Sequence, residues 1–320
     1  MQQPIGRRQR WAWMAAGLSA VVGVCLCGVS WLWLLLGGTA AMGYYYYLDR
    51  VLPEQGLAAQ LAGTLGWLGK ILTALTLVWT VAVMGWAAGL ADAAFPMVNG
   101  FPQLGWVLLA LVAWGTQKGS AACARCSGVL CLFLLALYGV LVAFSLPDVQ
   151  WVELRPQGEW DRSIWCLALF LMPAGVWYGP CAGENKKGGR LLVFLLPVFA
   201  AALAAVTAGV LTQPLATARP VPLYDLAQSV SLFGVVERME PLLSAALTMG
   251  VFSLLSSLAC ACQHLGDQLH PWNWTGPAAC VLAGALMYPV KAVSGDFLAA
   301  GDLLFWLAIP LLATAVSKSS

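Results

Sequence analysis

The chain has 320 residues, of which 61% are hydrophobic and only 9% are charged. Soluble globular domains carry about 25% charged residues, so this composition excludes an ordinary soluble enzyme and a disordered protein, and it indicates a membrane protein. The net charge of +2 is too small to attract nucleic acid. Sixteen tryptophans suit the headgroup regions of a bilayer. The ten cysteines are expected to pack as small apolar side chains and not to form a disulfide framework.

Apolar runs divide the chain into candidate transmembrane helices, each of which needs about 20 residues. The longest run without a charged residue covers residues 11–48. Eight further runs follow it, at residues 71–91, 93–117, 126–147, 163–183, 191–218, 241–266, 268–290 and 303–317. Residues 52–70 are moderately amphipathic and predict an interfacial helix. Residues 222–234 predict a helical segment in an extracytoplasmic loop.

The first run poses a choice between one long span and two spans joined by a tight turn. As a single helix, residues 11–48 would be about 57 Å long, nearly twice a bilayer core. A turn near residues 28–30, with the amino terminus in the cytoplasm, puts eleven of the 16 Lys and Arg residues on the cytoplasmic side. A single span divides them evenly. The positive-inside rule therefore favours two spans.

The sequence thus predicts an all-α integral membrane protein with about ten transmembrane helices. We expect one transmembrane domain over residues 1–320, with a basic cytoplasmic segment at residues 1–10 and both termini in the cytoplasm. A cleaved signal peptide is disfavoured, because the first apolar run far exceeds the roughly 7–15 residues of such a segment.

Few ionisable residues lie at membrane depth, where they are costly and often functional. Asp92 is either a site for a substrate amine or a proton, or an interfacial carboxylate that water reaches. Glu237, Arg238 and Glu240 open the eighth span. They either contact a ligand or stabilise the start of the helix and pair with one another.

Metal and cofactor sites have little support in the sequence. The pair Cys123 and Cys126 lacks the second pair that a structural zinc site needs. Cys260, Cys262 and His264 offer soft ligands, but packing is the simpler explanation. The sequence contains no phosphate-binding loop and no Ser/His/Asp grouping. We therefore predict no metal, no cofactor and no enzymatic activity.

The sixth span is the most unusual, because Pro173, Ala174 and Gly175 lie near its middle. Proline removes a backbone donor and frees a carbonyl upstream. A broken helix in the membrane is tolerated only where protein or a water-filled cavity covers it, and transporters use such breaks to bind a substrate carboxylate. The alternative is a proline kink that serves packing.

Small and hydroxylated residues on two other spans complete the candidate site. Ser244 and Thr248 lie one turn apart on the eighth span and could bond to a ligand or back to their own helix. Gly17 and Gly23 on the first span permit either a break or close helix packing. The predicted substrate-binding residues are Gly17, Gly23, Pro173, Ala174, Gly175, Ser244 and Thr248.

Four segments carry a resemblance to a known family. They are YYYLDRVLPEQG through GWLGK in residues 45–70, KGSAACARCSG and then LPD in residues 118–148, YGPCAGENKK in residues 178–187, and FGVVERMEPLLSAAL in residues 233–247. In order and spacing they resemble the spore germination permease family, the B-type subunit of nutrient germinant receptors. This family lies within the amino acid–polyamine–organocation transporter superfamily.

The resemblance implies a five-plus-five inverted-repeat transporter fold with both ends cytoplasmic. It also implies broken first and sixth spans around a central site for an amino acid or similar nutrient. Two departures stand out. Pro173 occupies the place where the family commonly has a Glu, and the first two spans abut without a polar loop.

The function implied is a membrane subunit of a spore nutrient germinant receptor. Such a subunit binds a small nutrient such as an amino acid and triggers germination. It signals through other receptor subunits in the spore inner membrane. A stand-alone secondary amino acid transporter is the alternative. For the receptor subunit, the expected partners are the nutrient, other germinant-receptor subunits and the lipid bilayer, with no nucleic acid.

Overall fold

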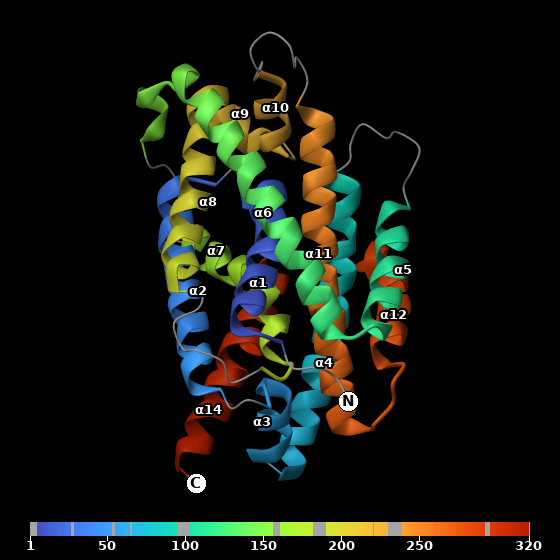
Figure 1. The fold of residues 1–320 in the computed structure, drawn as a ribbon. Helices are drawn as coiled ribbons and strands as arrows, with labels where there is room; N and C mark the ends of the chain where they lie inside the picture. The colour runs from blue at the N-terminus through green and yellow to red at the C-terminus, as the bar shows by residue number, and fades with distance from the viewer. Residues whose placement is uncertain are drawn as a thin grey trace.

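The computed structural model describes residues 5–26, 29–52, 55–64, 66–94, 103–155, 161–181, 190–219, 221–229, 239–291 and 295–319. Helices make up nearly all of this part of the chain (Figure 1). Extended pairing within it is confined to one isolated parallel bridge between Ile5 and Cys181. The fold is therefore all-α, as the composition predicts.

The helices follow one another in chain order as listed next. The α-helices are α1 (Arg7–Val21), α2 (Trp31–Val51), α3 (Leu57–Thr64), α4 (Gly66–Ala94), α5 (Leu104–Gln117), α6 (Ser120–Ser145), α7 (Asp161–Leu171), α8 (Arg190–Leu211), α9 (Gln213–Ala218), α10 (Pro222–Ser229), α11 (Glu240–Leu269), α12 (Thr275–Lys291), α13 (Gly295–Asp302) and α14 (Ile309–Ser319). Short 3₁₀ turns are η2 (Leu146–Asp148), η3 (Trp151–Leu154) and η4 (Met172–Trp177), and π-helical turns are η1 (Val22–Leu26) and η5 (Leu303–Ala308).

Several of these helices have the length and composition of membrane spans. Among the described residues, four helices are long and apolar enough to cross a bilayer: Gly66–Ala91, Ser120–Asp148, Glu240–Leu269 and Gly295–Val316. Shorter apolar helices cover Leu104–Gln117, Ser163–Trp177, Leu195–Leu211 and Thr275–Val290. Together with the α1–η1 segment and α2, they form an integral membrane bundle of about ten helices.

The first apolar run is two helices and not one rod. Helix α1 continues through η1 to Leu26, and α2 begins at Trp31. The two helices then pack in different places: α1 lies against α6 and α11, whereas α2 lies against α7 and α8. The turn predicted near residues 28–30 is confirmed by Val29 and Ser30, while residues 27 and 28 lie outside the described part.

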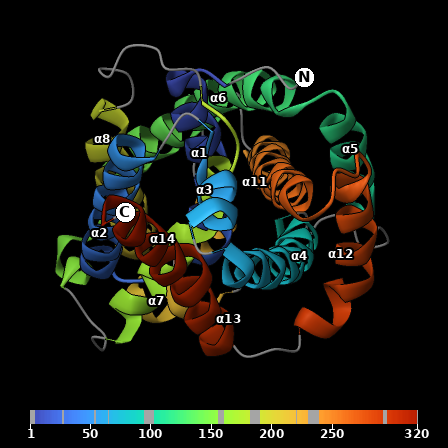
Figure 2. The same ribbon diagram turned by 90° about the horizontal axis from the view of Figure 1, so that it is seen from below.

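Helices α1 and α11 occupy the interior of the bundle (Figure 2). Buried residues occur on every side of α11, which is typical of a helix surrounded by protein. Small residues let the two backbones approach closely. A Cβ at Gly17 would lie 3.2 Å from the Leu254 Cα, and one at Gly250 would lie 3.0 Å from the Ala20 Cβ. Gly17 therefore serves close packing in this conformation, and the helix is unbroken there.

The two ends of the bundle are distinguished in Figure 1 by their short helices. The lower end carries α3, which contacts the end of the chain in α14. The upper end carries α9 and α10. Within the predicted interfacial stretch 52–70, the structure has α3 and the first turn of α4. Within the predicted segment 222–234, it has α10, and residues 230–234 lie outside the described part.

We predict that Gly17→Val lowers the free energy of unfolding by about 1–3 kcal/mol, because the added carbons meet the backbone of Leu254. Gly43→Val on α2 is the matched control, since a Cβ at Gly43 meets nothing within 4 Å. Its effect should stay within about 0.5 kcal/mol. Unfolding of both purified variants in detergent micelles measures the difference, and equal costs would contradict the packing.

Candidate functional site

The sixth span changes its helix type at Pro173. Helix α7 ends at Leu171, and the six residues of η4 that follow are all buried. In a 3₁₀ turn the residue at position 173 would donate to the carbonyl of Phe170, but proline has no N–H to donate. The Tyr45 hydroxyl fills this place and donates to the Phe170 oxygen at 2.9 Å. A side chain of α2 thus satisfies a backbone group that the proline leaves free.

Aromatic rings surround the lower end of η4. The Trp177 ring lies parallel to the Tyr45 ring, with centroids 5.9 Å apart, and meets the edge of Trp11 at 5.4 Å. The next residue, Tyr178, meets Trp306 of η5 edge to face at 5.4 Å. These rings tie the break to α1, α2 and η5, so the segment after Pro173 is held on three sides.

A buried arginine closes the region below these rings. The Arg10 side chain is 2% exposed, and its Nη2 donates to the Gly179 carbonyl at 3.0 Å. Its guanidinium also lies over the Trp177 ring, 4.8 Å from the centroid. From α11, His264 packs so tightly on Gly179 that a Cβ there would lie 2.6 Å from the imidazole Nε2. The first, sixth and eighth spans therefore converge at Gly179.

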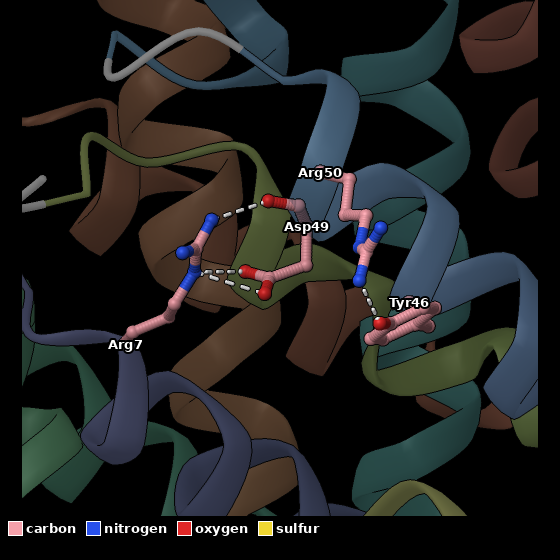
Figure 3. Close-up of polar contacts among 4 residues, drawn as sticks. All are labelled: Arg7, Tyr46, Asp49 and Arg50. Atoms are coloured by element: carbon pink, nitrogen blue, oxygen red, sulfur yellow. Dashed lines mark hydrogen bonds and ion pairs between the residues drawn. The ribbon is translucent and has the colours of Figure 1, made fainter. Parts of the chain in front are cut away.

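An ion pair at the lower end joins the start of α1 to the end of α2 (Figure 3). The Arg7 Nε lies 2.9 Å from the Asp49 Oδ2, and its Nη2 donates to the Asp49 carbonyl at 2.5 Å. The side chains are 19% and 8% exposed. Next to Asp49, Arg50 donates to the Tyr46 hydroxyl and lies over its ring. We call the Arg7–Asp49 pair the lower latch.

The predicted site residues fall into two groups along α11. The inner group is Gly17 with Pro173, Ala174 and Gly175. A Cβ at Gly175 would lie 2.9 Å from the Ser257 carbonyl oxygen, one turn from the Leu254 that faces Gly17. All four residues are buried. The structure therefore brings this part of the predicted site together, at a tight contact of α1 and η4 with α11.

The upper group is Gly23 with Ser244 and Thr248. A Cβ at Gly23, inside η1, would lie 2.5 Å from the Leu247 side chain. Ser244 is hydrogen-bonded to the Tyr224 hydroxyl of α10, which also donates to the Glu240 carbonyl at 3.2 Å. The Thr248 Oγ1 is buried and has no hydrogen-bond partner in the described part of the chain.

These two groups do not form one pocket. Leu247 and Ser257, the α11 residues nearest to each group, are ten positions apart, or about 15 Å along a helix. Two cavities lie elsewhere. One of about 680 Å³ opens at the α5–α6 turn beside Lys118 and Arg125, and one of about 310 Å³ lies between α6 and α8. Neither of these two cavities is lined by a residue of the two groups.

The other sequence candidates are placed as follows. Glu240 is buried, and its Oε2 has no partner among the described residues. Glu237, Arg238 and the Asp92 side chain lie outside the described part. Cys123 and Cys126 are free thiols, one buried and one exposed. Across the described ranges no three His, Cys, Asp or Glu residues are grouped as metal ligands.

Three buried side chains were not predicted from the sequence: Arg10 and Tyr45 beside the break, and Asp302 at the end of α13. Arg10 was counted as a loop charge, although it follows Arg7 by one helical turn and faces the interior. Tyr45 belongs to a run of four tyrosines, and only the structure shows which of them faces the break. Asp302 was treated as the boundary of the last apolar run, whereas Gly295–Val316 is one continuous span that contains it. Taking that span as a whole would have found an acid within the membrane.

Tyr45→Phe should lower the free energy of unfolding by about 1–3 kcal/mol, because the Phe170 carbonyl loses its partner while the ring contacts remain. The matched control is Tyr46→Phe, whose hydroxyl bonds to Arg50 at the surface. The control should change stability by at most about 0.5 kcal/mol. Indistinguishable unfolding of the two variants would show that Tyr45 does not support the break.

For the lower latch, a double-mutant cycle with Arg7→Gln and Asp49→Asn should give a coupling energy of about 1.5–3 kcal/mol, as expected for a mostly buried charged hydrogen bond. The upper-end pair of Arg219 and Asp225 is the control. Its atoms lie 3.4 Å apart and its side chains are 54% and 28% exposed, so its coupling should stay below about 1 kcal/mol. Equal coupling in the two cycles would argue against the latch.

Comparison with known proteins shows which fold the chain has and does not assign it to a protein family. No protein-family model matches the chain, and no curated protein matches it. Among solved structures, MhsT in complex with L-phenylalanine matches with a TM-score of 0.67 and 14% identity, covering 99% of this chain and 89% of that one.

Mhp1, a nucleobase-cation-symport-1 family transporter, matches in two states. Its closed conformation with bromovinylhydantoin bound has a TM-score of 0.59 and 14% identity, covering 94% of this chain and 76% of that one. Its inward-facing conformation has a TM-score of 0.54 and 17% identity, covering 95% and 74%. The chain therefore has the five-plus-five inverted-repeat fold of secondary transporters.

Proposed function

We propose that this protein is a transporter-fold membrane subunit of a spore nutrient germinant receptor, which binds a small nutrient such as an amino acid and triggers germination. The fold neighbours are transporters and not enzymes, and MhsT and Mhp1 were solved with L-phenylalanine and a hydantoin bound. The proposal adds other receptor subunits as partners. It also places the chain in the spore inner membrane with both termini in the cytoplasm.

One observation carries the binding part of the proposal: the buried helix break at Met172–Trp177. Its backbone lies in an apolar interior between α1, α2 and α11, and its lost hydrogen bond is replaced by a tyrosine hydroxyl. Interrupted helices at membrane depth are used by transporters to hold charged substrate groups. We propose that Pro173, Ala174 and Gly175 offer backbone groups to a nutrient carboxylate when the contact with Ser257 opens.

The upper group would be the second part of the site. The Thr248 hydroxyl is buried without a partner, and the Ser244 hydroxyl is shared with Tyr224. Both can bond to a ligand that enters from the upper end. Gly17 and Gly23 would keep α1 close enough to α11 to close over that ligand. Nutrient binding then shifts the population between the closed bundle and an open state.

A stand-alone secondary amino acid transporter is the second candidate. The lower latch suits this function, because alternating access needs a contact that closes one end of the bundle and can be released. Here the closing contacts join α1 to the ends of α2 and the sixth span. A receptor that keeps the transporter fold would retain the same contacts, so uptake must separate the two functions.

The direct test is germination of a deletion strain complemented with variants, against a panel of amino acids and sugars. Pro173→Ala restores the missing N–H and Thr248→Ala removes the free hydroxyl, so each should raise the nutrient concentration for half-maximal response by about tenfold or more. Gly43→Ala on the exposed face of α2 is the control and should leave the dose curve unchanged. Unchanged curves for both site variants would refute the proposed ligand site.

Uptake separates the receptor from the transporter. Purified protein in liposomes is given a mixture of radiolabelled amino acids. A germination defect on deletion without accumulation supports the receptor, whereas accumulation without a germination defect supports the stand-alone transporter.

A further inference from the structure

Asp302 is an acid inside a membrane-spanning helix. It ends α13 within the continuous apolar segment Gly295–Val316, about 10 Å along the helix from its start. Its side chain is fully buried. An ionised carboxylate at such a position is costly unless charged or donating groups satisfy both of its oxygens.

The two hydrogen bonds to this carboxyl group both go to the same oxygen atom. The Trp79 Nε1 of α4 and the Trp306 Nε1 of η5 both donate to Oδ1, each at 3.0 Å. Oδ2 is buried and has no partner in the described residues. Gly301 makes room for the Trp79 indole, because a Cβ at Gly301 would overlap the Trp79 ring. One oxygen is therefore held by two donors, and the other is left to a ligand.

Among the described side chains, no cation faces Asp302 from the elements packed around it. Helix α2 presents the hydroxyls of Tyr44 and Tyr45, and Tyr178 follows η4. The described side chains of α3 and α7 include no Lys, Arg, His, Asp or Glu. On α4 the described cation is Lys70, which is exposed and nine residues before Trp79. On its own helix, Asp296 is exposed in the first turn of α13.

A metal ion does not fit the same place. The nearby backbone oxygens of Trp306 and Phe305 already accept the hydroxyls of Tyr44 and Tyr178. Hard cations need several oxygen ligands, whereas among the described residues no three His, Cys, Asp or Glu side chains gather here and Oδ2 is the unpartnered carboxylate oxygen. The ligand that satisfies one buried carboxylate oxygen without bringing a hydration shell is a proton.

We propose that Asp302 is a proton-binding site, protonated on Oδ2 in this closed bundle. Protonation forms one O–H bond and makes the carboxyl neutral; release breaks that bond and passes the proton to water, leaving the carboxylate. The bound proton stabilises the contact of α4 with α13 and η5, since it removes the charge that this apolar contact would otherwise bury. Water reaches Oδ2 when the contact opens, and the proton then leaves.

Trp306 connects the Asp302 site to the residues beside the helix break. Trp306 donates to Asp302 with its indole, packs on Tyr178 with its ring, and accepts the Tyr44 hydroxyl with its carbonyl. The π-helical turn η5 begins directly after Asp302, and such turns often mark functional sites. The inference does not rest on the proposed function, since a receptor and a transporter would both use the same site.

Infrared spectroscopy of the purified full-length protein in lipid nanodiscs tests the proposal. At neutral pH the wild type should show the carbonyl stretching band of a protonated carboxylic acid, shifted by ¹³C-labelled aspartate. Asp302→Asn should lose this band, and Asp296→Asn should retain it. A wild-type spectrum without the band, or a band that survives in Asp302→Asn, would overturn the proposal.

A second variant keeps the proposal testable if Asp302→Asn fails to fold. Trp79→Phe keeps the acid and removes one donor that stabilises the carboxylate, so the band should persist to higher pH than in the wild type. Trp86→Phe, on the same helix, is the control and should leave the titration unchanged. A Trp79→Phe titration identical to that of the wild type would contradict the assignment to Asp302.

Discussion

A helix that loses its hydrogen-bond ladder inside an apolar bundle must find other partners for its backbone. This constraint organises the centre of the molecule. Pro173 cannot donate to the Phe170 carbonyl, and the Tyr45 hydroxyl takes the donor's place. The break is therefore stabilised by the tyrosine that α2 brings to it. The chain turns between Leu26 and Trp31, and this turn sets the path of α2. The position of Tyr45 beside the break therefore depends on that turn.

The close packing around α11 follows from the break. Once η4 is held from the α2 side, its other side rests on the α11 backbone, and Gly175 leaves room for that contact as Gly17 does for α1. The lower end is then closed by charge: Arg7 on Asp49, and Arg10 on the Gly179 carbonyl. Each of these contacts joins segments that a transporter-fold protein would have to separate in order to admit or release a ligand.

The sequence predicted the fold to a large extent, because charge distribution and apolar run length follow from the bilayer itself. The all-α bundle, the number of spans and the turn after the first helix all came from those two properties. The resemblance also implied a break in the first span. The structure instead shows a helix that is continuous from Arg7 to Leu26 and widens to π-helix at Val22, since Gly17 and Gly23 are used to pack against α11 and its side chains.

The candidate site was harder to predict, because its geometry depends on which helix faces which. Proline and glycine marked the break at Pro173, but nothing local distinguishes Tyr45 from its three tyrosine neighbours. Likewise, the spacing of Ser244 and Thr248 says nothing about how far along α11 they lie from Gly175. Asp302 was missed for a different reason. When each apolar run is ended at a charged residue, an acid inside a span is placed at the end of the run. The protein accommodates Asp302 within the span through hydrogen bonds from two indoles.

The most direct test of the account is an experimental structure of the full chain in lipid nanodiscs, at a resolution that shows carbonyl oxygens. We predict an α-helix that stops at Leu171, a 3₁₀ turn through Trp177 and the Tyr45 oxygen within hydrogen-bonding distance of the Phe170 carbonyl. A sixth span that continues as an unbroken α-helix past Pro173, with Tyr45 turned away from it, would contradict it.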